Sequence, residues 1–144
     1  GLVDNQLSVA ISYIAINLPF ATWMLKGFFD SISIEIEEAA FIDGMGPAQS
    51  FLKIMLPLSL PGIATVAIFT FNNCWNEYML ASVFLRSNEL QTMTIGLQMF
   101  QVQNNADWST MMAASTIALI PSIIFLVFMQ KYIVQGLTAG AVKG

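Results

Sequence analysis

The sequence predicts an all-α membrane protein with three transmembrane helices and a cytoplasmic helix–turn–helix loop. Of its 144 residues, 56% are hydrophobic and only 10% are charged, whereas a soluble domain carries about a quarter charged residues. The charged residues also leave three long uncharged gaps, at 5–25, 54–76 and 108–130. A helix that crosses the hydrocarbon core needs about 20 residues. We therefore expect transmembrane helices near 7–25, 60–81 and 110–132.

A further uncharged gap, at 90–106, is rich in glutamine and asparagine. Side chains of this kind are costly in lipid unless they find partners. We therefore expect a short surface helix and a loop here, within an external loop 82–109.

The basic residues predict the orientation, because cytoplasmic loops of membrane proteins carry an excess of Lys and Arg. Four basic residues fall on one side of the predicted spans: Lys26, Lys53, Lys131 and Lys143. The other side has Arg86 alone. This places the loop 26–57 and the tail 133–144 in the cytoplasm and the N-terminus outside.

Several classes of function fit the composition poorly. A net charge of −4 gives no basic field for nucleic acid. The sequence has no histidine, the commonest general base and metal ligand, and Cys74 has no second cysteine to pair with. We expect no metal, no cofactor and no enzyme activity. Because the chain starts at Gly1 without an initiator methionine or a signal-peptide pattern, we expect it to be half of a larger subunit.

The loop 26–57 begins with the pattern of a short amphipathic helix. Ser33 suits the N-cap, and three acidic residues follow in the first turns, where the helix dipole favours them: Glu35, Glu37 and Glu38. Four small or apolar residues are spaced to share one face: Ile32, Ile36, Ala39 and Ala40. The alanines would let another surface approach this face closely.

A turn and a second helix follow. Gly44 suits a left-handed residue that ends the first helix, and Pro47 suits the first position of the next. The second helix carries an i, i+3, i+4, i+7 apolar stripe of Phe51, Ile54, Met55 and Leu58, and Pro57 then turns the chain toward the membrane. The acidic balance favours docking to a protein over docking to an anionic lipid surface.

The spacing of this loop resembles a known motif. Glu38-Ala39-Ala40 is followed by three residues, Gly44, nine residues and Ile54-x-Leu56-Pro57. This resembles the EAA loop of binding-protein-dependent ABC importer permeases, in particular the maltose-permease-G-like subunits of the carbohydrate-uptake branch. Ser33 stands where such permeases often have proline. The resemblance extends over essentially the whole chain.

The resemblance implies a multi-pass permease subunit of the inner membrane and a set of partners. These partners would be cytoplasmic ATPase subunits, a second permease subunit and an extracytoplasmic solute-binding protein. Residues of the EAA loop would dock on the ATPase, and ATP-driven motion would give alternating access to a sugar or similar polar solute. The docking residues implied are Glu38, Ala39, Ala40, Asp43, Gly44, Phe51, Ile54, Leu56 and Pro57.

The second predicted span also carries a polar face, formed by Asn72, Asn73, Asn76 and Glu77. Neutral hydrogen-bonding groups beside aromatic rings suit a path for sugars. The same residues could instead pair across helix interfaces, as amides in membranes commonly do. Two other functions also stay open: an ion-coupled secondary carrier, and a membrane enzyme whose catalytic groups lie in the other half.

Overall fold

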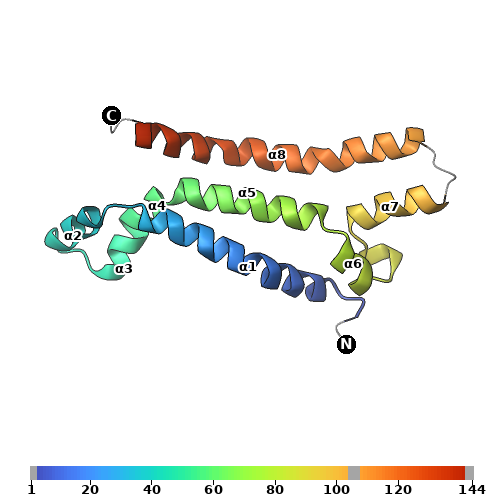
Figure 1. Ribbon diagram of the computed structural model, residues 1–144, viewed down its shortest axis with the longest axis horizontal. Helices are drawn as coiled ribbons and strands as arrows, with labels where there is room; N and C mark the ends of the chain where they lie inside the picture. The colour runs from blue at the N-terminus through green and yellow to red at the C-terminus, as the bar shows by residue number, and fades with distance from the viewer. Residues whose placement is uncertain (1–2, 104–107, 142–144) are drawn as a thin grey trace. The chain divides into compact units, whose positions relative to one another are not determined.

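The protein is an all-α membrane protein, as its composition predicts. The computed structural model describes residues 3–103 and 108–141, and every regular element within these residues is helical (Figure 1). The longer helices are α1 (Gln6–Asp30), α2 (Ile34–Ile42), α5 (Leu60–Asn76), α7 (Met93–Gln103) and α8 (Trp108–Ala141). The shorter ones are α3 (Pro47–Ser50), a π-helical turn (Phe51–Met55), α4 (Leu56–Leu58), α6 (Met79–Phe84) and a 3-10 turn (Asn88–Leu90).

Two of these helices, α1 and α8, are long and apolar enough to cross a membrane. The 17-residue α5 makes a third only together with the helical segment 47–58 before it, from which it is bent by 66°. Many large apolar side chains of α1 and α8 are exposed in the isolated chain, among them Leu7, Ile14, Trp23, Ile117 and Ile123. A water-soluble monomer rarely exposes so continuous an apolar surface, whereas lipid covers it readily.

The helix expected over 60–81 is interrupted in the structure. Helix α5 ends at Asn76, residues 77 and 78 are not helical, and α6 begins at Met79. The 34-residue α8 is longer than the span expected at 110–132, and continues to Ala141 through most of the expected tail. Residues 104–107 of the predicted external loop and Lys143 of the tail lie outside the described residues. The surface helix expected within 90–106 corresponds to α7.

The chain forms two compact units. The first combines the start of α1, up to Leu18, with residues 70–126, and the second combines residues 19–69 with the end of α8. The first unit has an apolar core of Val9, Ala81, Leu85 and Ile95, with Tyr13, Phe84, Leu90 and Met99 packed against it.

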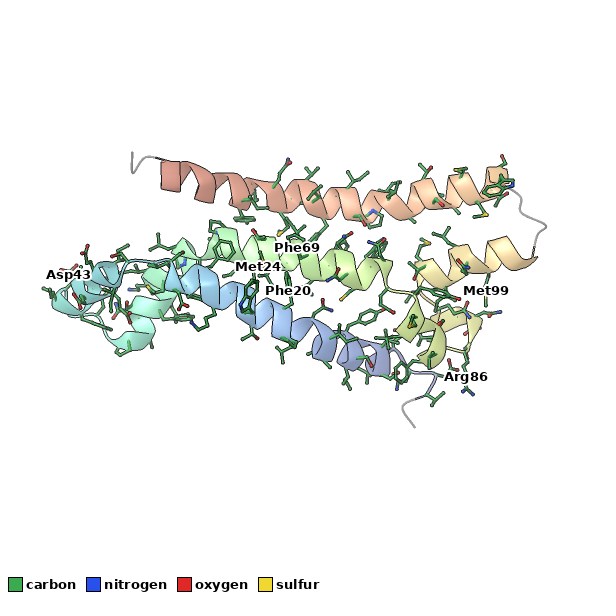
Figure 2. The ribbon with its side chains drawn as sticks, in the orientation of Figure 1. Phe20, Met24, Asp43, Phe69, Arg86 and Met99 are labelled. Atoms are coloured by element: carbon green, nitrogen blue, oxygen red, sulfur yellow. The ribbon has the colours of Figure 1, made fainter. Side chains whose placement is uncertain are left out.

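In the second unit, aromatic pairs hold the helices together. Phe20 of α1 and Phe69 of α5 meet edge to face, with ring centroids 5.9 Å apart (Figure 2). Phe29 stacks on Phe51 of the π-helical turn at 6.0 Å. These contacts fix α5 and the π-helical turn against α1.

Candidate functional site

The segment 34–58 folds as the predicted helix–turn–helix, which we call the coupling hairpin after the role that the sequence predicts for it. Gly44 has a φ of +81°, and two backbone hydrogen bonds close the turn after α2. The Met45 N–H donates to the Ala40 carbonyl and the Gly44 N–H to the Phe41 carbonyl, both at 3.0 Å. This pair of bonds is the Schellman motif, which satisfies carbonyls left free at a helix end. The turn is therefore fixed by the local sequence.

The start of each hairpin helix also follows the predicted pattern, with one difference. Pro47 occupies the first position of α3, as expected. Ser33 is the N-cap of α2, but its side chain makes no capping hydrogen bond, and its carbonyl accepts from the Ile36 N–H at 3.1 Å. The beginning of α2 therefore depends on backbone geometry and on the acidic first turn.

The small residues predicted to share one face of α2 differ in exposure. Ala40 is only 2% exposed, whereas Ala39 and Glu38 are exposed. Ile42 is 86% exposed, and Asp43 lies in the turn between α2 and α3 with its side chain in the open (Figure 2). The hairpin thus uses Ala40 for its own packing and presents Glu38, Ala39, Ile42 and Asp43 on its surface.

The second half of the hairpin is not the regular helix that the stripe predicted. Residues 51–55 form a π-helical turn in which the Leu56 N–H donates to the Phe51 carbonyl, five residues back. Pro57 explains the wider turn, because a proline ring clashes with the carbonyl four residues before it in an α-helix. That carbonyl belongs to Lys53, inside the π-helical turn.

The wider turn changes how the predicted docking residues are presented. Ile54 and Leu56 are half-buried, while Phe51 and Pro57 are exposed. Leu52, which the stripe did not include, is 61% exposed. Short π-helical segments occur often at functional sites. The structure brings Phe51, Leu52 and Leu58 to the surface of the hairpin.

The polar residues of α5 point in two directions. The Asn76 side-chain amide donates to the Asn72 backbone carbonyl and to Asn72 Oδ1, both at 2.8 Å. The Asn73 amide donates instead to Asn17 Oδ1 on α1 at 3.4 Å. Asn17 is buried and also donates to the Tyr13 carbonyl at 2.8 Å. Asn73 therefore pairs across a helix interface, while Asn72 and Asn76 form a separate exposed pair.

Asn72 and Asn76 line a cavity of about 360 Å³ in the first unit. We call it the amide cavity. The other lining residues come from α5, α7 and α8: Trp75, Met93, Thr94, Leu97, Ser115, Ala118, Leu119 and Ser122. Hydroxyl and amide groups alternate there with apolar side chains, and none of these residues is charged. This volume is within the range of small-molecule pockets.

Trp75 and Phe71 join α5 to α8 beside this cavity. The Trp75 indole N–H donates to the Ala118 carbonyl at 3.2 Å, one turn before Pro121. Phe71 stacks on Phe125 with centroids 4.2 Å apart. The wall that α8 contributes is thus held by α5.

Glu77 does not line the cavity. Its carboxylate accepts from the Leu80 N–H at 2.7 Å, the Ala81 N–H at 3.1 Å and the Tyr13 hydroxyl at 2.9 Å. Leu80 and Ala81 are the second and third residues of α6, whose amides lack partners within the helix. Glu77 therefore caps the first turn of α6, directly after α5 ends, at the point where the helix predicted over 60–81 is interrupted.

Sequence reasoning missed the cavity residues outside α5. Ser115 and Ser122 are seven residues apart on α8, a spacing that places both on one helical face, so the sequence held a signal for them. The sequence held no such signal for Met93 and Thr94, because their position depends on how α7 folds back toward α5.

Comparison with known proteins identifies the family. Residues 2–139 match the model of the binding-protein-dependent transport system inner membrane component. The chain is 38% identical over its whole length to the inner membrane ABC transporter permease protein YcjP of Escherichia coli, covering 51% of that protein. It is also 38% identical, again over its whole length, to the trehalose/maltose transport system permease protein MalG of Thermococcus litoralis and to the diacetylchitobiose uptake system permease protein DasC of Streptomyces coelicolor, covering 52% of each.

The chain thus spans about half the length of these curated relatives. Their names describe transport permeases, and the match extends through the coupling hairpin and the amide cavity. The chain belongs to the family of inner membrane components of binding-protein-dependent transport systems.

Proposed function

We propose that this chain is part of a permease subunit of an ATP-driven importer, and that the coupling hairpin docks on a cytoplasmic ATPase subunit. A second permease subunit and an extracytoplasmic binding protein complete the assembly. The observation that carries the proposal is the hairpin itself: a turn locked by its own hydrogen bonds, which holds Glu38 and Ala39 exposed.

The chemistry of the hairpin surface favours a protein partner with a basic apolar groove. Glu35, Glu38 and Asp43 are exposed and acidic, and Ile42, Phe51 and Leu52 are exposed and apolar beside them. Burying such apolar side chains stabilises a complex, and opposite charges on the partner orient it. Ala39 has no side chain beyond Cβ, so the partner can approach the α2 backbone closely.

Co-purification of the assembled transporter tests this proposal. The full-length permease is expressed with its partner permease and ATPase, solubilised in mild detergent and captured on the permease. Glu38→Lys should reduce the recovered ATPase about tenfold or more, because reversing one partner of a buried charge pair costs on the order of 2–5 kcal/mol.

The matched control is Glu89→Lys, the same charge reversal at an exposed glutamate of the 3-10 turn. It should leave the ATPase recovery at the wild-type level. Equal recovery with Glu38→Lys, or no ATPase with the wild-type permease, would show that the hairpin is not the docking element. Uptake that collapses with an uncoupler at constant ATP would favour the ion-coupled carrier instead.

We further infer that the amide cavity belongs to the path of the solute and that the solute is a sugar or a similar polyol. Support comes from the lining of the cavity, which offers neutral hydrogen-bonding groups beside the Trp75 ring and no charge. The names of the relatives from Thermococcus litoralis and Streptomyces coelicolor, which are transport permeases for trehalose/maltose and diacetylchitobiose, support a sugar.

Uptake of radiolabelled trehalose, maltose and diacetylchitobiose by cells carrying the whole transporter tests the cargo. Asn76→Leu should lower uptake while ATPase recovery stays at the wild-type level, since the substitution removes an amide from the cavity and leaves the coupling hairpin unchanged. Wild-type uptake of none of these sugars would refute the sugar assignment. Unchanged uptake by Asn76→Leu would exclude the cavity from the path.

A further inference from the structure

Four helices of the first unit are joined through one residue, Glu77. Its two carboxylate oxygens accept from the amides of Leu80 and Ala81, in the first turn of α6. The same carboxylate accepts from the Tyr13 hydroxyl of α1. The backbone carbonyl of Glu77 accepts from Thr94 Oγ1 of α7 at 2.8 Å. Glu77 itself directly follows Asn76, the last residue of α5.

Two of these contacts exceed what a helix cap requires. Capping α6 needs only the amide bonds, which satisfy donors at the helix start and place a negative charge where the dipole favours it. The Tyr13 and Thr94 hydroxyls add links to two other helices. A half-buried carboxylate is stabilised by each donor that replaces water, so the tyrosine bond also fixes where the carboxylate lies.

Glu77 is next to two polar residues that line the amide cavity, and we call Glu77 with its hydrogen-bond partners the junction. Thr94 lines the amide cavity and is held by the Glu77 carbonyl, and Asn76 lines it one residue earlier. A shift of Glu77 would therefore displace the Thr94 hydroxyl and the Asn76 amide together. Those two groups come from α7 and α5, and in the part of the chain that the structure describes they do not hydrogen-bond to each other.

We propose that Glu77 is a positioning residue for the amide cavity, held in place from α1 by the Tyr13 hydroxyl. Glu77 ends α5 at Asn76 and fixes Thr94 on α7, so the spacing of polar groups across the cavity depends on it. A displacement of α1 would move Glu77 through its hydrogen bond with Tyr13, and would thereby move the polar groups of the cavity. The inference rests on the proposed function in one respect, that the cavity accepts the solute.

Single-hydroxyl variants test the junction in the full-length permease, assembled with its partners in lipid nanodiscs or in cells. Tyr13→Phe removes only the bond from α1. It should raise the concentration of trehalose, maltose or diacetylchitobiose that gives half-maximal uptake by about two- to tenfold, the range expected for one hydrogen bond. The maximal rate should change little, because the coupling hairpin is untouched.

A second readout needs no solute. Hydrogen exchange of the Leu80 and Ala81 amides should be faster in Tyr13→Phe, because the carboxylate that binds them is less well fixed. Thr94→Val should raise the sugar concentration that gives half-maximal uptake, as Tyr13→Phe does. Thr94→Ser keeps the hydroxyl, so this concentration should stay near the wild-type value. Tyr132→Phe on α8 is the matched control for Tyr13→Phe and should change neither readout.

Unchanged half-saturation in Tyr13→Phe would overturn the proposal, even if exchange became faster, because the junction would then hold α6 without reaching the cavity. Equal effects of Thr94→Ser and Thr94→Val would also overturn it. If the wild-type transporter imports none of the probe sugars, the cargo assignment fails separately. Exchange at Leu80 and Ala81 then decides the junction alone, and unchanged exchange in Tyr13→Phe overturns it.

Discussion

Gly44 is the residue on which the coupling hairpin turns, and its backbone conformation explains why. A φ of +81° is costly for residues with a Cβ, by about 1–2 kcal/mol. A Cβ built on Gly44 meets nothing within 4 Å, so the penalty is conformational and not steric. Gly44→Ala should therefore lower ATPase recovery in co-purification by roughly tenfold if the turn must be kept for docking. Gly44→Asn should lose much less, because asparagine tolerates this region. Equal losses would point to a contact at Gly44 instead of the turn.

Two serines of the second unit are equally buried but differ in their hydrogen bonding. Ser50 is 1% exposed and its hydroxyl has no partner among the described residues, whereas the hydroxyl of Ser59, which is 2% exposed, donates to the Met55 carbonyl at 2.8 Å. A buried unpaired polar group costs about 1–3 kcal/mol. Ser50→Ala should therefore leave the thermal unfolding midpoint of the purified transporter unchanged or raise it. Ser59→Ala, the matched variant, should lower the midpoint. The reverse order would show that Ser50 finds a partner in the assembly.

Among the elements, the sequence predicted those whose signals are local. Gly44 and Pro47 predicted the turn of the coupling hairpin because each acts through its own backbone. The π-helical turn was missed because periodicity counts residues per turn and ignores the ring of Pro57. The break after α5 was missed although Glu77 acts on nearby amides there, those of Leu80 and Ala81; only its further bond to Tyr13, 64 residues away, has no local pattern. The split of the polar face likewise depends on the position of Asn17 on α1.

The contact between α1 and α5 in the second unit requires a glycine at position 62. Gly62 is buried, and a Cβ added there would lie 2.3 Å from Phe28 Cγ and 2.8 Å from Phe28 Cβ. These atoms are near the backbone and cannot swing away as a flexible tip would. Gly62→Ala should destabilise the transporter by about 1–3 kcal/mol, as overpacking does, measured by thermal unfolding. The double variant Gly62→Ala with Phe28→Ala should recover part of the loss. No recovery would mean that the clash lies elsewhere.

The segment before α1 is tied to the turn after α6 by Asp4. Its carboxylate accepts from the Arg86 and Ser87 amides at 2.9 and 2.8 Å, and from the Ser87 hydroxyl. The Ser87 hydroxyl, then the two amides, hold the pKa of Asp4 below its ordinary value of 3.8. A lowered pKa in the folded state stabilises the contact at pH above 3.8 and loses this effect as pH falls through the lowered value. Protection of the Arg86 and Ser87 amides from hydrogen exchange, relative to their intrinsic rates, should fall in that acidic window. Asp4→Ala should lack this pH dependence, and its persistence there would assign it to another group.

For the whole molecule, the composition was enough to predict the fold class but not the full set of residues that line the amide cavity. Three uncharged gaps predicted an all-α membrane protein, because lipid demands long apolar helices with internally bonded backbones. The amide cavity was only half predicted. Asn72 and Asn76 lie on one element and could be grouped by spacing, while Thr94 on α7 enters through tertiary packing that no local pattern encodes.

The orientation of the chain is the prediction on which both proposed partners depend. In the proposed assembly, the ATPase would meet the coupling hairpin in the cytoplasm, and the binding protein would meet the opposite side. Asn88 and Gln49 are exposed and lie on opposite sides of α5 along the sequence. In a full-length background with Cys74→Ala, Asn88→Cys should react with a membrane-impermeant maleimide in intact cells. Gln49→Cys should react only after the inner membrane is permeabilised. The opposite pattern would invert the chain and remove the coupling hairpin from reach of any cytoplasmic ATPase. Labelling of both residues in intact cells would mean that α5 does not cross the membrane, which leaves α1 and α8 as the spanning helices of this chain.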